Sequence, residues 1–380
     1  MQHRKIIVIL CMLVSISIGM FAAGRSEGQA AGQITGQGFI NETWLPLFTS
    51  SGFNPSIGSE GIFISHGEIA ALPMSGPAWQ TVLNWAQESA NSPDLSESKD
   101  QTDAVVVAKA LVYVRTGQAH FRDEAVDGIL AAMGSEQGSG ILAVGRNLAG
   151  YIVAADLVGL DGSDDAQFRA WLDQVRFHVF NGAGPDLSIV SCHETRPNNF
   201  GTHCGTSRLA AALYLGDDAE VARAATVFRG YLGDRTAYTG FSFGSDLSWQ
   251  CDPDQPVGIN PAGCQKSNQP LGGVLPDDQR RGGSFTWPPP QENYVWEALQ
   301  GAVAQARILE RQGYDAFNWS DQALLRAVTW VHQQADYEAT ADDSGTPWLI
   351  NNVYGSNFPT DSGSRPGKNG LGFYEWLTTH

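Results

Sequence analysis

The chain has 380 residues, of which 40 are acidic and 23 are basic, so its formal net charge at pH 7 is −17. A chain this acidic attracts neither nucleic acid nor an anionic membrane surface, and we expect neither as a partner. Its length is enough for one sizeable hydrophobic core.

The N-terminal segment is typical of a secretory signal peptide. A start of Met-Gln-His-Arg-Lys precedes an apolar run from Ile6 to Phe21, and Ala22, Ala23 and Gly24 are small residues of the kind at which a signal peptidase cleaves. We therefore predict a signal peptide and flexible lead over residues 1–30 and a single domain over residues 31–380. The mature chain is expected to be secreted or periplasmic, monomeric and without membrane contacts.

Helical periodicity dominates the rest of the chain, because apolar residues recur three and four positions apart, whereas strand signals are sparse. The predicted helices cover residues 78–90, 103–116, 121–133, 144–157, 166–180, 207–215, 219–232, 292–312 and 320–337. They follow one another as pairs, and runs of small residues at 209–213 and 301–306 suit helices packed closely on two sides. The predicted fold class is all-α, an α/α toroid or incomplete α/α barrel of paired antiparallel helices with long cleft loops.

Two segments lack this periodicity. The stretch from Tyr238 to Pro290 is rich in glycine and proline, and ordered loops of such length are usually functional, so we interpret it as the wall of a cleft. The tail over residues 342–380 carries aromatic side chains among glycines, which predicts an ordered segment rather than disorder.

Four cysteines follow the signal segment: Cys192, Cys204, Cys251 and Cys264. In an oxidising compartment they are expected to form two disulfides, and four cysteines allow three pairings. We favour the pairs that are close in sequence, Cys192 with Cys204 and Cys251 with Cys264, since each would close a loop beside a candidate site segment. The chain lacks the Cys-x-x-Cys spacing typical of zinc sites, and we predict no metal or other cofactor.

Residues 196–203 read Arg-Pro-Asn-Asn-Phe-Gly-Thr-His and contain the first candidate site. Asn199 and His203 are four positions apart, which puts an amide and an imidazole on one face of a helix or turn. Alternatively, Asn199 caps the following helix and His203 is a buried core residue. Gly201 and Gly205 cost about 1 kcal/mol each in a regular helix, which indicates a close approach of backbone or ligand.

The second candidate site lies near residue 290. Tyr294 follows three prolines, which favour the first turn of a helix, and the helix dipole there stabilises a phenolate. Arg280 and Arg281 precede it in a loop with two glycines. Alternatively, Tyr294 belongs to an aromatic core stripe, and the two arginines pair with Asp277 and Asp278 at the surface.

These group types fit the β-elimination of an acidic polysaccharide. A guanidinium or amide draws charge from the sugar carboxylate, a base removes the adjacent proton, and an acid protonates the leaving oxygen. The candidate catalytic residues are Tyr294, His203, Asn199 and Arg281. Arginines would form a local positive cleft on the acidic chain and tryptophans would stack on sugar rings, so the candidate substrate-binding residues are Asn198, Arg196, Arg280, Arg146, Trp249 and Trp287.

Residues 196–203, with residues 292–299 that read Glu-Asn-Tyr-Val-Trp-Glu-Ala-Leu, resemble the alginate-lyase-like α/α-toroid polysaccharide lyases. The nearest group is the mannuronate and glucuronan lyases of polysaccharide lyase family thirty-eight. The resemblance implies that Asn199 neutralises the uronate carboxylate, His203 assists as a base, and Tyr294 is the acid or both acid and base. It also implies that Arg281 is a partner of the substrate or of Tyr294. The histidine often follows Asn-Asn directly in those lyases, whereas three residues intervene here.

We therefore expect a lyase that needs no metal and cleaves alginate, especially polymannuronate, or glucuronan to unsaturated uronate ends. The expected partner is this acidic polysaccharide. Two alternatives stay open. A glycoside hydrolase on the same scaffold would use two carboxylates, Asp246 or Asp252 with Asp277 or Asp278, although their spacing singles out no pair. A non-catalytic glycan-binding protein would bind the polymer without turnover.

Overall fold

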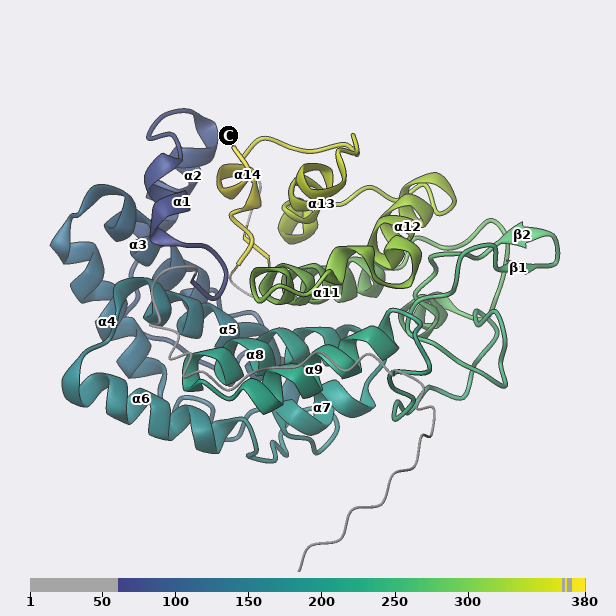
Figure 1. The fold of residues 1–380 in the computed structure, drawn as a ribbon, viewed down its shortest axis with the longest axis horizontal. Coiled ribbons are helices and arrows are strands. Elements are labelled where there is room, and N and C mark those ends of the chain that lie inside the picture. The colour runs from purple at the N-terminus through teal and green to yellow at the C-terminus, as the bar shows by residue number, and fades with distance from the viewer. Residues whose placement is uncertain (1–60, 364–365, 368–370, 380) are drawn as a thin grey trace, which may run out of the picture. The chain divides into compact units, whose positions relative to one another are not determined.

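The computed structural model describes residues 61–363, 366–367 and 371–379 (Figure 1). These residues are mostly helical, so the predicted all-α class is confirmed at this level. The predicted signal peptide and lead, residues 1–30, and the first part of the predicted domain, residues 31–60, lie outside the described residues.

The helices of the described part follow one another with few strand residues between them. The α-helices are α1 (His66–Ala71), α2 (Pro77–Ala86), α3 (Thr102–Thr116), α4 (Ala119–Ala132), α5 (Ile141–Val158), α6 (Gly162–Val175), α7 (Ile189–Thr195), α8 (Asn199–Leu215), α9 (Asp218–Tyr231), α10 (Pro276–Gln279), α11 (Asn293–Arg311), α12 (Trp319–Gln333), α13 (Thr346–Tyr354) and α14 (Tyr374–Leu377). Short 3-10 helices are η1 (Arg280–Gly282), η2 (Ala316–Asn318) and η3 (Ala341–Asp343), and a small antiparallel ribbon joins β1 (Gln265–Lys266) to β2 (Gln269–Pro270).

The helices contact one another in a regular order. α3, α5, α8 and α11 each pack on the next, and the contacts continue from α11 to α13, from α13 to α14, and from α14 through α2 back to α3. A second set packs against these: α4 on α3 and α5, α6, α7 and α9 on α8, and α12 on α11 and α13. Figure 1 shows α5, α8 and α11 adjacent to one another in the middle of the fold, with α4, α6 and α7 outside them.

Small residues let α8 pack closely on both of its neighbours. A Cβ atom at Gly145 of α5 would lie 2.9 Å from the Cys204 sulfur, and one at Gly301 of α11 would lie 2.6 Å from the Thr202 backbone. Larger side chains at either position would push the helices apart, because cores packed at this density have no spare volume. The prediction that small-residue runs mark closely packed helices is confirmed at Gly301 of α11. In α8 the predicted run at 209–213 is buried from Leu209 to Ala212.

Within the part of the chain that the structure describes, α5 is the one helix long and apolar enough to cross a membrane. Nearly all of its side chains are buried, and it packs against α3, α4 and α8. An apolar helix that is buried on every side is typical of the core of a soluble domain.

The first turns of α8 were not predicted, because the periodic pattern placed its start at residue 207 and the helix begins at Asn199. Glycine and threonine have low helix propensity, which hides these turns from a periodicity argument. Gly201 and Gly205 lie in regular helix, and each stands at a close contact. A Cβ atom at Gly201 would lie 1.8 Å from the Arg196 carbonyl oxygen, and one at Gly205 would lie 2.3 Å from the Gln305 side chain. The close approach that the glycines indicate is therefore made by the protein's own atoms. The helix predicted over 166–180 instead begins at Gly162 and ends at Val175.

Both predicted disulfide pairings are confirmed. Cys192 and Cys204 have Cα atoms 6.1 Å apart and join α7 to α8, and Cys251 and Cys264 have Cα atoms 5.7 Å apart within the 238–290 segment. Both separations lie in the usual range for disulfides. The tail is ordered in its described part, as predicted: the buried Trp376 on α14 donates a hydrogen bond to the Pro73 carbonyl at 2.9 Å.

One buried carboxyl lies in the contact between α3 and α5. Asp103 packs against Gly150, and its Oδ2 has no hydrogen-bond partner among the described residues. Burial raises the pKa of the Asp103 carboxyl well above its usual range, against the lowering effect of the Ala104 N–H, and the charge of Asp100 adds to the increase. In the folded protein the carboxyl therefore keeps its proton at pH values where the unfolded chain ionises it. Stability falls as pH rises from the unfolded pKa toward the folded one.

We expect Asp103→Asn to remove this pH dependence. For one proton the loss amounts to at most about 1.4 kcal/mol per pH unit above the unfolded pKa, and the amide cannot ionise. The variant should match wild type at about pH 3 and be the more stable protein at about pH 7. Urea unfolding of both proteins across this range measures the difference between them, so other titrating groups cancel. Parallel pH profiles for the two proteins would contradict the assignment.

Candidate active site at the first turns of α8 and α11

The first turn of α8 is joined to α10 by two asparagines and two aspartates. Asn198 caps the helix: its Oδ1 accepts from the Phe200 N–H at 3.1 Å, and its Nδ2 donates to Asp277 Oδ2 at 2.7 Å. The Asn199 N–H donates to Asp278 Oδ1 at 3.0 Å. The motif at 196–203 and the loop segment before Tyr294, far apart in sequence, thus form one structural unit.

Arg280 is neutralised within this unit. Its Nε donates to Asp277 Oδ1 at 2.8 Å, and the same oxygen accepts from the Gly244 N–H at 2.9 Å. A Cβ atom at Gly244 would lie 2.1 Å from the Arg280 guanidinium, so a larger residue there would require the arginine side chain to shift. Asp278 is fully buried, and burial raises the pKa of its carboxyl well above the usual range, with a further increase from Asp277. The pairing of Arg280 with Asp277, given above as the alternative to substrate binding, is what the structure contains.

Asn199 and His203 are both completely buried. The amide oxygen and nitrogen of the Asn199 side chain have no hydrogen-bond partner in the described part of the chain. An unpartnered buried amide costs free energy, so the fold retains hydrogen-bonding capacity here that it does not itself use. The alternative that Asn199 is the helix cap is wrong, because Asn198 holds that position. Contact between these two side chains and a sugar requires the first turn of α8 to open.

Tyr294 and Arg281 are in direct contact. Tyr294 stands in the first turn of α11, where the Glu292 side chain accepts its backbone N–H at 3.1 Å. The central carbon of the Arg281 guanidinium lies 3.7 Å from the centre of the tyrosine ring. Arg281 is exposed and Tyr294 is half-buried, so both are open to a ligand from solvent. A guanidinium over an aromatic face is a favourable contact and places positive charge beside the phenol.

A buried ion pair supports the same turn of α11. Arg146 on α5 pairs with Glu297, which lies three residues after Tyr294 and so on the same face of the helix. Burial lowers the pKa of the Arg146 guanidinium to about 10, while the charges of Asp342, Tyr294 and Asp343 oppose the decrease. Arg146 therefore stays charged at neutral pH, and its partner Glu297 lies one turn after Tyr294 on α11. The sequence placed Arg146 among substrate-binding residues, and the structure shows it buried between two helices.

The predicted tryptophan platforms differ from each other in exposure. Trp249 is fully buried, donates to the Gly283 carbonyl at 2.8 Å, and packs edge-on against Phe285 and Trp330. It is a core residue of the loop segment, because its indole fills the interior that the glycine-rich loops enclose. Trp287 is half-buried and keeps an open face, which is compatible with stacking on a sugar.

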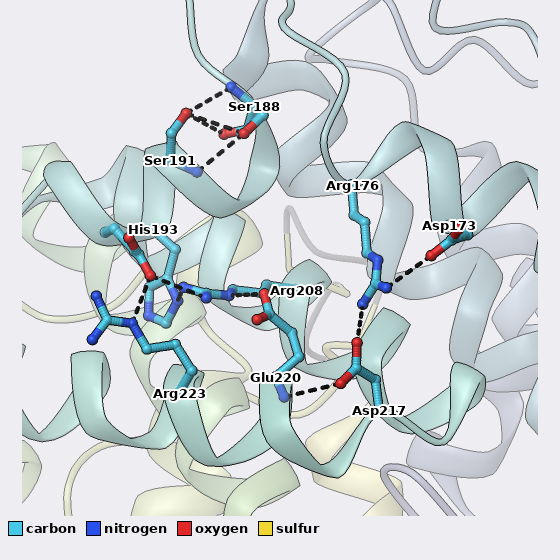
Figure 2. A network of polar contacts seen from close by, with 10 residues as sticks. Asp173, Arg176, Ser188, Ser191, His193, Arg208, Asp217, Glu220 and Arg223 are labelled. Carbon is cyan, nitrogen blue, oxygen red and sulfur yellow. Dashed lines mark hydrogen bonds and ion pairs between the residues drawn. The ribbon is translucent and has the colours of Figure 1, made fainter. Parts of the chain in front are cut away.

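A charged network that the sequence analysis missed holds α7 against α8 and α9 (Figure 2). Arg208 is buried on α8 and donates to Glu220 Oε1 at 2.7 Å and to Glu194 Oε1 at 3.1 Å, and Arg223 donates to that same Glu194 oxygen at 2.8 Å. Arg208 also lies 3.4 Å from the buried His193 ring, and burial, with the charge of Arg208, lowers the pKa of that imidazole. The available signal was an arginine inside a run of small apolar residues.

This network and the first disulfide fix the segment that leads into the candidate site. Figure 2 shows Arg208 reaching across from α8 to the end of α7, and the disulfide joins the same two helices. Arg196 follows directly, half-buried, with its Nε lacking a partner within the described chain. The turn over residues 196–199 is therefore attached on one side to α7 and on the other to α10.

In the described residues, no group of three or more His, Cys, Asp or Glu side chains is arranged to hold a metal ion. No protein-family model matches the chain, and no curated protein matches it. The resemblance to the polysaccharide lyases accordingly rests on the two sequence motifs.

Proposed function

We propose that this protein is a secreted polysaccharide lyase that cleaves a uronic-acid polymer by β-elimination. The observation that carries the proposal is the contact between Arg281 and Tyr294 at 3.7 Å, with both side chains open to solvent. This contact puts a cation for the sugar carboxylate and a proton-transfer group for the adjacent carbon within reach of one sugar ring.

The proposed scaffold is an α/α toroid. The order of contacts supports it, since α3, α5, α8, α11, α13, α14 and α2 form a closed sequence of neighbours that a second set of helices covers. Pairs of helices arranged in this way place the starts of several inner helices near one another, which is where Tyr294 and Asn199 stand.

In the proposed reaction the uronate carboxylate binds Arg281. The Asn199 amide is the second donor only when the hydrogen bonds of Asn198 and Asn199 to Asp277 and Asp278 break and the first turn of α8 opens. Withdrawal of charge by these groups acidifies the C5 proton. Tyr294, as phenolate, takes that proton; the C5 electron pair forms the C4–C5 double bond while the C4–O bond breaks. The phenol then returns the proton to the leaving glycosidic oxygen, so Tyr294 ends in its starting state.

The stereochemistry of the sugar decides the role of the histidine. In mannuronate the C5 proton and the leaving oxygen lie on one face, so Tyr294 serves as both base and acid. Glucuronate has the same configuration at C4 and C5, so the same holds for it. In guluronate, the C5 epimer of mannuronate, the two groups lie on opposite faces, and His203 would be the base on the second face. A reaction on one face needs no second base and so makes no use of the fully buried His203. Mannuronate and glucuronate therefore require less rearrangement of the observed geometry than guluronate.

The proposed location of the protein is outside the cytoplasm. Two disulfides are compatible with an extracellular or periplasmic protein.

A hydrolase would need an accessible carboxyl that keeps its proton. Asp277 and Asp278 are buried and hold Asn198 and Asn199, whereas hydrogen bonds from Ser248 lower the pKa of Asp246. None of these three carboxyls meets both requirements.

The test is the absorbance of purified protein with polymannuronate, polyguluronate and glucuronan over time. β-Elimination leaves a conjugated unsaturated uronate that absorbs in the ultraviolet, and hydrolysis does not. We expect a rise with polymannuronate. New reducing ends without absorbance would establish the hydrolase instead, and binding without either product would establish a glycan-binding protein.

A further inference from the structure

We propose that the chain has a second glycan-binding site, which takes uncharged sugar residues, in a cavity between the end of α2 and the start of α3. The cavity has a volume of about 450 Å³ and is open to solvent. It is lined by one aromatic side chain, Trp85, and by amide, hydroxyl and carboxylate groups. The binding itself goes beyond the proposed lyase function and does not depend on it.

The lining has the composition that sugar rings require. Trp85 offers a half-buried indole face, and its ring is held by an edge-on contact with Phe373 at 6.5 Å between centroids. Asn84 and Gln101 add exposed amides to the lining. An aromatic face covers the C–H side of a pyranose while amides bond its hydroxyl groups, and polar groups that are few and fixed in place give orientation.

The charges in the cavity select against a uronate. Glu88 and Asp100 line it, and none of the lining side chains is a lysine, arginine or histidine. A sugar carboxylate would meet two like charges and no donor cation, which is unfavourable at this range. Carboxylate oxygens accept hydrogen bonds from sugar hydroxyls, so an uncharged pyranose keeps the attraction and avoids the repulsion.

Part of this lining is already fixed by the fold. Asp100 Oδ1 accepts from the Thr102 hydroxyl at 2.9 Å and Oδ2 accepts from the Asp94 N–H at 3.2 Å, which holds the start of α3 in place. Fixed groups lose less conformational entropy when a ligand binds. The cavity is thus shaped before any sugar enters it.

Isothermal titration calorimetry with the whole protein tests the binding. The probes are uncharged oligosaccharides built from mannose, glucose, galactose or xylose, with oligomannuronate and an oligomer of glucosamine for comparison. We expect saturable binding of at least one uncharged oligosaccharide, weakened about tenfold or more by Trp85→Ala. Gln101→Ala should weaken the binding too. Because Gln101 is exposed, this variant should fold normally and tests the cavity even if Trp85→Ala misfolds.

The matched control is Trp348→Ala, which removes a half-buried tryptophan of α13 outside the cavity and should leave the affinity unchanged. The proposal is overturned if no uncharged oligosaccharide binds, if Trp85→Ala and Gln101→Ala both bind like wild type, or if the glucosamine oligomer alone binds. Calorimetry needs no turnover, so failure here is separate from failure of the absorbance assay.

Discussion

Tyr294→Phe is expected to lower the turnover number on the preferred polyuronate by about 10²–10⁴-fold, with little change in KM. The substitution removes one oxygen atom and leaves the ring on which Arg281 lies at 3.7 Å, so binding of the carboxylate should persist. What is lost is the group that takes the C5 proton and returns it to the leaving oxygen. Initial rates of ultraviolet absorbance over a range of polymer concentrations measure both constants.

Tyr337→Phe is the matched control for this substitution. Tyr337 is also half-buried and lies at the same end of α11, where its hydroxyl donates to Asn293 Oδ1 at 3.2 Å. Loss of that hydrogen bond should cost about 1 kcal/mol of stability and leave turnover within a few-fold of wild type. Turnover of Tyr294→Phe close to that of Tyr337→Phe would remove Tyr294 from the mechanism.

Much of the helical fold could be predicted because its evidence is local. The apolar periodicity of α3, α5, α9 and α11 marks one buried face or a fully buried helix, and such patterns are legible in a short window of sequence. The pairing of cysteines was predictable for a related reason, since both partners of each pair lie close in sequence. The start of α8 was not predictable from periodicity, because glycines in its first turns interrupt the apolar pattern. These glycines are required by close contacts with the Arg196 carbonyl and with Gln305 of α11, which periodicity does not show.

The candidate site was also predictable only in part: its residue types followed from local sequence, and its long-range contacts did not. The motifs at 196–203 and 292–299 identified the residue types, and the helix start at Tyr294 followed from the prolines before it. Burial and partners could not be predicted, because they depend on contacts between distant segments. Asp277 and Asp278 bind Asn198 and Asn199 across the fold, and this contact turns apparent surface charges into buried supports.

The buried position of Trp249 shows that local sequence does not predict whether a single side chain is buried or exposed. A tryptophan in a glycine-rich loop fits a sugar platform as well as a small core, and composition alone does not separate them. Its neighbours Phe285 and Trp330 come from two other segments, and together they form the interior that the second disulfide closes. Trp85, which the sequence analysis did not single out, instead lines an open cavity because α2 and α3 meet there.

Arg146→Met is expected to lower the free energy of unfolding by about 3–5 kcal/mol, the usual loss when one partner of a buried ion pair is removed. Both side chains of the pair are nearly inaccessible, at 8% and 9% exposure, so Glu297 would keep its charge in a site without the guanidinium. Methionine occupies a similar volume, which limits the contribution of a cavity. Urea denaturation at neutral pH measures the loss, and a change below about 1 kcal/mol would contradict the assignment.

Combining Arg146→Met with Glu297→Met separates the stabilising role of the pair from its place beside Tyr294. With both charges gone, stability should return to within about 1–2 kcal/mol of wild type, because no unpaired charge stays buried. If Arg146 serves the fold alone, turnover returns with stability. If its charge also assists the carboxylate or Tyr294, the double variant is stable and still turns over slowly. We expect the second result, because Glu297, the partner of Arg146, lies three residues after Tyr294 on the same face of α11.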